Sequence, residues 1–254
     1  MMVDGETDYL DMYDTANLTA GGAAPVLTVD QVPEGSAARD TGPQRYAFQT
    51  GFAPPEEPFT VHATVLAPFP TSDGGVTPKE HQSQGVYLGP GDQDNYVKLV
   101  ATAGDGTGGI ELASEVDGTY RTVTVVEDPA VVADGVVIDL YLTVEPSTGQ
   151  VTASYSVDDG PVTYAGETNV PTAWVDESRG TAMGVIATSY GPGEPFPATW
   201  GQLDARTGEA VGAPPSVRTV YDPAPGPWLP GHVAPSKAAA EPATANATAD
   251  GADS

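Results

Sequence analysis

The sequence contains no cysteine, so disulfides, thiolate chemistry and cysteine-based zinc sites are excluded. Lysine is almost as scarce, because only Lys79, Lys98 and Lys237 occur in 254 residues. Phosphate backbones and anionic lipid surfaces bind to clustered cations, and the chain has no such cluster. Neither nucleic acid nor an anionic membrane is therefore an expected partner.

Long hydrophobic runs are also absent. No stretch approaches the ~20 apolar residues of a membrane span, so membrane insertion is not expected. The first residues, MMVDGETDYLDMYD, have neither the basic region nor the apolar region of a signal peptide. The chain is thus expected to be cytoplasmic if it is whole, or one piece of a longer exported protein.

Acidic residues dominate the charge. The chain carries 35 Asp and Glu against 9 Lys and Arg, a formal net charge of -26, and the acids are spread along its length. Such a surface repels itself at low salt, whereas at molar salt the Debye length falls to ~3 Å and the repulsion is screened. The pattern favours a protein from a salt-loving organism. A calcium-loaded surface is the alternative, and the scatter of the acids argues against it.

The hydrophobic pattern is that of half-buried strands. In VVIDLYLTV, Ile138, Leu140 and Leu142 alternate with Asp139, Tyr141 and Thr143, which gives the period of two of a strand with one buried face. Asp-Gly pairs, such as Asp117-Gly118, supply the positive φ angles of tight hairpins. No window shows a helical stripe. Strands are expected at 26–30, 45–49, 59–66, 84–88, 95–101, 109–115, 119–126, 136–144, 150–157, 161–165, 182–189 and 199–205.

Composition divides the chain into three parts. Residues 1–19 form an acidic N-terminal segment, and residues 20–206 contain all the expected strands. Residues 207–254 are rich in Pro, Ala and Thr and cannot bury a core, so a disordered acidic tail is expected there. The fold class is therefore all-β, with a single domain of a sandwich or barrel type.

Three segments carry a family resemblance: SQGVYLGPGDQDNYVKLV (83–100), LYLTVEPSTGQVTASYSVDDG (140–160) and AMGVIATSYGPGEPFPATW (182–200). Together they resemble a β-sandwich module of the concanavalin A-like lectin/glucanase superfamily. Such modules accompany malectin-like domains and quinoprotein sugar dehydrogenases, and a related sandwich ends some glycoside hydrolases. The resemblance implies a two-sheet antiparallel jelly roll in a carbohydrate-associated, extracellular or surface protein. Fold alone implies no activity.

The glycine-rich corner of the first segment contains two aspartates. Its structural interpretation is a turn, which Gly89 and Gly91 permit and Asp92 caps. Its functional interpretation is a calcium site made by Asp92, Asp94 and Asn95. Calcium needs six to eight oxygens, and two carboxylates fall short. The turn is therefore favoured, no cofactor is expected, and calcium is the one candidate metal.

Catalytic motifs are missing. Glucanases of this fold carry closely spaced carboxylates on one strand, and retaining hydrolysis needs two carboxyl groups ~5–5.5 Å apart. Glu111 and Glu115 share a strand face but lie ~13 Å apart along it. A nucleophile elbow and a His-Glu-x-x-His site are also absent. The sequence therefore predicts that the domain is not an enzyme, although a triad dispersed along the chain stays open.

Aromatic side chains are the candidate ligand-binding residues, because sugar C–H faces stack on aromatic rings. Trp200 is expected in the core, Trp174 on an exposed loop, and Tyr141 on the polar side of its strand. Lys98 is expected to be a solvent-facing charge paired with a carboxylate of a neighbouring strand. The predicted ligand-binding residues are Tyr87, Tyr96, Tyr141, Trp174 and Tyr190.

The sequence therefore predicts a non-catalytic accessory module of a larger multidomain protein. It is expected to bind carbohydrate or another cell-surface component in high salt. Two alternatives stay open. One is a glycoside hydrolase-type domain, which would need two close carboxyl groups in a groove. The other is a purely structural surface spacer.

Overall fold

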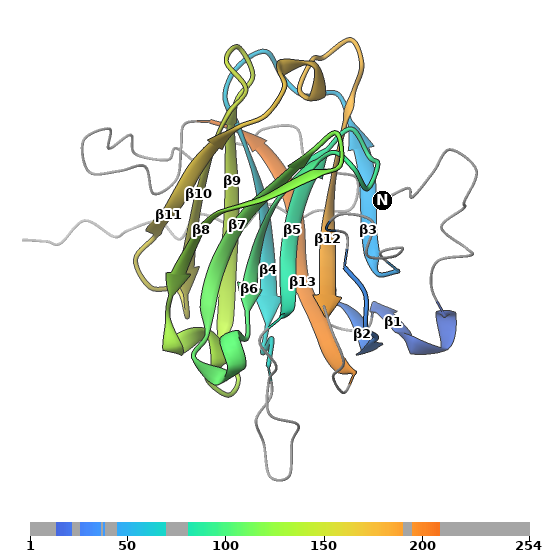
Figure 1. The fold of residues 1–254 in the computed structure, drawn as a ribbon, viewed down its shortest axis with the longest axis vertical. Helices are drawn as coiled ribbons and strands as arrows, with labels where there is room; N and C mark the ends of the chain where they lie inside the picture. Colours follow the sequence, from blue (N-terminus) through green and yellow to red (C-terminus); the bar gives the residue numbers. More distant parts are fainter. Residues whose placement is uncertain are drawn as a thin grey trace, which may run out of the picture.

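Two antiparallel β-sheets stack face to face in the computed structural model, which describes residues 14–21, 26–36, 38, 45–69, 81–189 and 195–208 (Figure 1). The seven-stranded sheet has the order β1 (Leu18–Gly21), β2 (Val26–Val32), β13 (Phe196–Thr207), β4 (Phe59–Leu66), β9 (Val137–Glu145), β10 (Gln150–Val157) and β11 (Thr163–Asn169). The six-stranded sheet has the order β3 (Ala47–Phe52), β12 (Thr181–Ser189), β5 (Gln82–Gly89), β6 (Tyr96–Thr102), β7 (Gly109–Val116) and β8 (Thr119–Glu127).

Helical structure in the described residues is confined to single 3-10 turns. These are η2 (Thr15–Asn17), η3 (Gly104–Gly106), η4 (Pro129–Val132) and η5 (Thr172–Trp174). None of the described helices combines the length and the apolar character needed to cross a membrane. The predicted all-β, two-sheet antiparallel sandwich is confirmed.

Strand positions follow the hydrophobic alternation closely. β4 and β10 have the predicted bounds, and most other strands differ by one to three residues at an end. β1 was not predicted, because LTAG is short and has little apolar character. Most of the predicted acidic segment and nearly all of the predicted tail lie outside the described residues.

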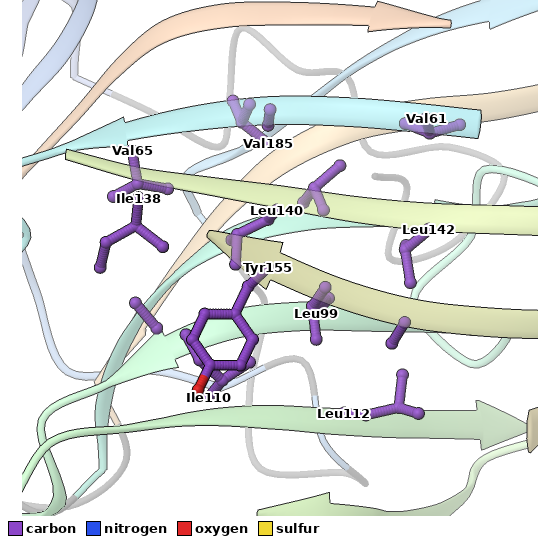
Figure 2. Packing of buried hydrophobic residues seen from close by; sticks show 14 of the residues in the cluster. Val61, Val65, Leu99, Ile110, Leu112, Ile138, Leu140, Leu142, Tyr155 and Val185 are labelled. Atoms are coloured by element: carbon purple, nitrogen blue, oxygen red, sulfur yellow. The ribbon is translucent and has the colours of Figure 1, made fainter. Parts of the chain in front are cut away.

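The core lies between the two sheets and is built from the apolar member of each alternating pair (Figure 2). On β9, Ile138, Leu140 and Leu142 are fully buried, and they face Leu99 and Leu112 of the other sheet within one continuous cluster. Burying each such side chain contributes about 1.5–3 kcal/mol. The intervening residues of β9, Asp139 and Tyr141, are held on the opposite face of their sheet.

Both tryptophans in the described part of the chain belong to the core. Trp200 is 2% exposed, as predicted, and its indole Nε1–H donates to the Gly85 carbonyl oxygen at 3.1 Å, which ties the two sheets together. Trp174 is only 7% exposed and packs in the same cluster with Val170 and Val175. The expectation of an exposed Trp174 platform is wrong, because the η5 turn directs its ring into the end of the sandwich.

Hairpin geometry agrees with the turn chemistry. Asp117 and Gly118 have φ angles of 49° and 71° and join β7 to β8. Positive φ at both residues matches the twist of the flanking strands. This tight connection pairs β7 with β8 at the edge of the six-stranded sheet, where the candidate site is found, and the register of the pair shifts once, between Leu112 and Ala113.

Candidate functional site

The face of the six-stranded sheet that points away from the main core carries tyrosines and charged side chains. They alternate with core residues such as Val97 and Leu99, so the same alternation that fills the core presents them on the other side. We call this set the tyrosine–glutamate face. Its members are Gln49, Tyr87, Tyr96, Lys98, Glu111, Glu115 and Tyr120.

Each tyrosine of this face donates a hydrogen bond to a neighbour. The Tyr87 hydroxyl donates to Gln49 Oε1 at 2.8 Å, and the Tyr96 hydroxyl donates to Glu115 Oε2 at 3.0 Å. The Tyr120 hydroxyl donates to Glu111 Oε1 at 2.7 Å. Burial and the nearby carboxylates raise the pKa of Tyr96 and of Tyr120. The hydroxyls therefore stay protonated and act as donors, while the glutamates act as acceptors.

Lys98 supplies the one cation of this face. Its Nζ lies 3.8 Å from Glu111 Oε1 and 5.6 Å from the centre of the Tyr120 ring. The predicted pairing with a carboxylate of the neighbouring strand is thus found. The predicted exposure is wrong, because Lys98 is 4% exposed. A cation held between a carboxylate and an aromatic ring keeps its charge partly compensated.

The face is open to solvent mainly at the β7–β8 edge. Tyr87, Tyr96 and Glu115 are fully buried. The Glu111 side chain is 22% exposed, Tyr120 is half-buried, and Val125, which pairs with Glu111 across the strands, is 51% exposed. We call Glu111, Tyr120 and Val125 the open end. It combines an acceptor, an aromatic ring and an apolar side chain.

The predicted ligand-binding residues are spread over the molecule. Tyr87 and Tyr96 lie on the tyrosine–glutamate face, but both are fully buried. Tyr141 lies on the outer face of the other sheet, and Tyr190 is outside the described residues. Tyr120 was missed, although its alternation in YRTVTVV places it on the polar side of β8.

The glycine-rich corner is built as a turn. Asp92 Oδ1 accepts from the Asp94 backbone N–H at 3.0 Å and from the Asn95 side-chain amide at 3.0 Å. Asn95 Oδ1 accepts in turn from the Asp117 backbone N–H at 3.0 Å. A Cβ at Gly89 would overlap the Asn95 carbonyl oxygen, which explains the glycine. The side chains of Asp92 and Asn95 therefore make hydrogen bonds within the turn and to the neighbouring β7–β8 hairpin.

Removal of calcium is therefore expected to leave the melting temperature of the protein unchanged. Asp92 already accepts two hydrogen bonds, and no group of three or more His, Asp or Glu side chains within the described ranges is arranged to hold a metal. Thermal unfolding with excess EGTA and with millimolar calcium, at constant ionic strength, checks this. A melting temperature that rises with calcium, and no longer does so in Asp92→Asn, would contradict it.

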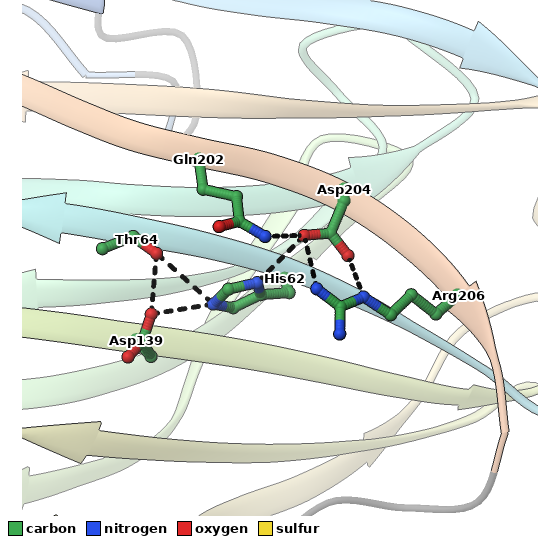
Figure 3. Close-up of polar contacts among 6 residues, drawn as sticks. All are labelled: His62, Thr64, Asp139, Gln202, Asp204 and Arg206. Carbon is green, nitrogen blue, oxygen red and sulfur yellow. Dashed lines mark hydrogen bonds and ion pairs between the residues drawn. The ribbon is translucent and has the colours of Figure 1, made fainter. Parts of the chain in front are cut away.

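A second polar cluster lies on the outer face of the seven-stranded sheet (Figure 3). His62 of β4 stands between Asp139 of β9 and Asp204 of β13, with its Nε2 2.8 Å from Asp139 Oδ1 and its Nδ1 3.1 Å from Asp204 Oδ2. Asp204 also accepts from Arg206 and from Gln202. We call these residues and Thr64 the His62 cluster. Sequence analysis missed it, because its members come from three strands.

Comparison with known proteins places the fold among domains found in carbohydrate-active enzymes. Neither a family model nor a curated protein sequence matches the chain. Solved structures do match, among them the GH43 protein BlXynB of Bacillus licheniformis, with a TM-score of 0.53, 14% identity and coverage of 71% of this chain and 32% of that one. The Bacteroides ovatus xyloglucan PUL GH43B matches with a TM-score of 0.54 and 18% identity, and the match covers 77% of this chain and 35% of that one.

A xylan β-1,4-xylosidase of Bacillus halodurans gives a TM-score of 0.54 at 11% identity, with 76% of this chain and 35% of that one covered. The chain thus spans about a third of the length of these structures. At such low identity the likeness shows the fold alone. That fold is a two-sheet antiparallel β-sandwich.

The prediction that the domain is not an enzyme is contradicted by these comparisons. Several of the solved structures that share its fold are GH43 glycoside hydrolases. The physical reason is that sequence motifs contain only residues close together in the chain. A sheet brings carboxylates together from separate strands, as Asp139 and Asp204 meet at His62. The lack of a single-strand motif therefore does not exclude chemistry. The chain shares the β-sandwich fold found in these carbohydrate-active proteins.

Proposed function

We propose that the protein binds a neutral polysaccharide through the open end of the tyrosine–glutamate face. The observation that carries the proposal is the pairing of Tyr120 with Glu111 beside the exposed Val125. An aromatic ring and an apolar side chain suit the C–H face of a sugar, and a carboxylate suits its hydroxyls. Lys98 beneath the ring fixes the position of both groups.

The negative charge of the face and of the whole chain favours a neutral polysaccharide over an acidic one. The face holds two glutamates against one lysine, and the whole chain carries a formal net charge of -26. A uronate-rich polymer would meet repulsion from both, whereas a neutral xylan or glucan would not. The preference should be strongest at low salt and weaken at molar salt, where charges are screened.

We also infer that the domain belongs to a larger protein that works outside the cell or at its surface, in concentrated salt. The structural neighbours are about three times as long as the matched region, which supports a domain that works beside others in a larger protein. Neutral xylans and glucans occur outside the cell or at its surface. The acidic composition supports work in concentrated salt.

Replacing Tyr120 by alanine is expected to weaken binding of a xylo-oligosaccharide about tenfold, because the stacking surface is lost. Glu111→Gln should weaken it severalfold by removing a charged acceptor. Titration calorimetry in molar KCl measures both effects. Glu167→Gln is the matched control, since Glu167 is an exposed glutamate of β11 in the other sheet.

The outcome that would overturn the proposal is binding that Tyr120→Ala and Glu111→Gln leave unchanged, or tighter binding of alginate oligosaccharide than of the xylo-oligosaccharide. The same samples are assayed for new reducing ends. Release of reducing ends that Glu111→Gln abolishes would extend the proposal from binding to hydrolysis at this face.

A further inference from the structure

The His62 ring has a carboxylate on both sides. Its Nδ1 lies 3.1 Å from Asp204 Oδ2 and its Nε2 lies 2.8 Å from Asp139 Oδ1. A neutral imidazole has one N–H, so one nitrogen would direct a lone pair at a carboxylate oxygen. An imidazolium has two N–H groups and donates to both. The geometry therefore requires the protonated ring, provided that the carboxylates are ionised.

Asp204 is ionised for an independent reason. It is fully buried, and it accepts from the Arg206 Nε–H at 2.7 Å and Nη2–H at 3.2 Å as well as from the Gln202 amide. A carboxylate with this many donors binds no proton of its own. Burial alone would raise the pKa of Asp204, but the hydrogen bonds from His62, Arg206 and Gln202 outweigh it and lower that pKa.

The charges around His62 also favour its imidazolium form. Among the described residues, the titratable and charged groups that face His62 are Asp139 and Tyr141 from β9 and Asp204 and Arg206 from β13, and β4 itself holds none besides His62. With an imidazolium the cluster holds two anions and two cations. With a neutral ring it would hold an excess negative charge in a site that is nearly closed to water.

Stacking of Tyr141 on His62 also favours the protonated form of His62. Its ring stacks on that of His62 with centroids 4.8 Å apart and an interplanar angle of 13°. The electron-rich face of a tyrosine attracts a positive charge placed over it. The predicted polar-side position of Tyr141, shared with Asp139, is thus found, and its neighbour is a histidine.

We propose that His62 is a pH-sensitive lock of the seven-stranded sheet: as an imidazolium it joins side chains of the adjacent strands β13, β4 and β9, and on deprotonation this link is lost while the strands stay paired through their backbones. Asp204 and Asp139 lie 142 and 77 residues from His62 in the sequence, so the lock links distant parts of the chain. It lies on the opposite sheet from the tyrosine–glutamate face, and it does not rest on the proposed function.

The direction of the pH dependence follows from linkage. Burial would lower the pKa of His62, but the hydrogen bonds that His62 donates to Asp139 and Asp204, together with the charges of these carboxylates, outweigh it, so the pKa is raised above 6.5. A group with a raised pKa stabilises the folded state fully at pH values below its unfolded pKa. This stabilisation is lost as the pH rises through the folded pKa. The lock is therefore closed at pH values below 6.5 and opens as the pH rises through the folded pKa of His62.

Two measurements on the full chain test this. An NMR titration of the imidazole protons should show His62 titrating above pH 6.5. In thermal unfolding, the melting temperature of the wild type should fall by roughly 3–5 °C per pH unit between pH 6.5 and the folded pKa of His62. His62→Gln, which cannot titrate, should lose that slope, while His81→Gln should keep it.

A His62 pKa at or below 6.5, or an equal slope in His62→Gln and the wild type, would overturn the proposal. If His62→Gln does not fold, the NMR titration of the wild-type protein decides alone. Asp139→Asn then provides the second variant, because loss of one carboxylate should lower the pKa of His62 in a protein that keeps Asp204, Arg206 and Gln202 in place.

Discussion

Replacing Leu140 by alanine is expected to lower the free energy of unfolding by about 2–5 kcal/mol. Leu140 is fully buried at the centre of β9 and packs between the two sheets (Figure 2). The substitution removes three carbon atoms, and neighbours from both sheets cannot close the cavity without moving paired strands. Chemical denaturation at a fixed molar salt concentration measures the change.

Val162→Ala is the control for Leu140→Ala. Val162 is 39% exposed, and its truncation should cost less than about 0.5 kcal/mol. Equal costs for the two substitutions would mean that β9 does not present Leu140 to the core. The alternation would then be misassigned, and Asp139 and Tyr141 would lose their place on the outer face.

Replacing Gly184 by alanine is expected to destabilise the protein by about 1–3 kcal/mol and to displace Tyr87. A Cβ at this position would overlap the Phe48 carbonyl oxygen and lie 2.6 Å from Tyr87 Cε1. The Phe48 oxygen belongs to strand β3, which is paired with β12 and cannot easily shift. The Tyr87 ring is the more movable neighbour, so we expect it to be displaced. Its hydrogen bond to Gln49 would then be lost. Denaturation and the near-ultraviolet circular dichroism of tyrosine report the two effects.

Gly51→Ala is the matched control for Gly184→Ala. Gly51 lies in β3 of the same sheet, and a Cβ there would meet the Thr181 carbonyl oxygen at 3.8 Å, an ordinary contact. This variant should keep the tyrosine signal and change stability little. A Gly184→Ala protein that is as stable as Gly51→Ala, with an unchanged signal, would show that Tyr87 does not pack on Gly184.

The fold could be predicted because it depends on local patterns. The alternation in VVIDLYLTV fixes which side of β9 is buried, and Asp117-Gly118 fixes where β7 turns into β8. Both signals lie within a few residues. β1 carries neither signal and was missed, and Trp174 was misplaced because the orientation of a short turn depends on the tertiary contacts around it.

The sites were harder to predict, because their residues meet only after the strands pair. The partners of His62 are 77 and 142 residues away, and nothing near His62 in the sequence indicates them. Tyr96 and Glu115 are partners across β6 and β7, a relation that depends on register. Candidate side chains could therefore be assigned to a face of their own strand, but their neighbours could not be named.

The proposed function depends on contact between a neutral glycan and the open end of the tyrosine–glutamate face. Backbone NMR of the full chain in molar KCl, titrated with xylohexaose, tests it most directly. We expect the amide signals of Glu111, Tyr120 and Val125 to shift together, with smaller shifts at Lys98. Shifts that gather around Tyr141 and Thr143 on the other sheet, or a spectrum that xylohexaose and a neutral gluco-oligosaccharide both leave unchanged, would contradict it.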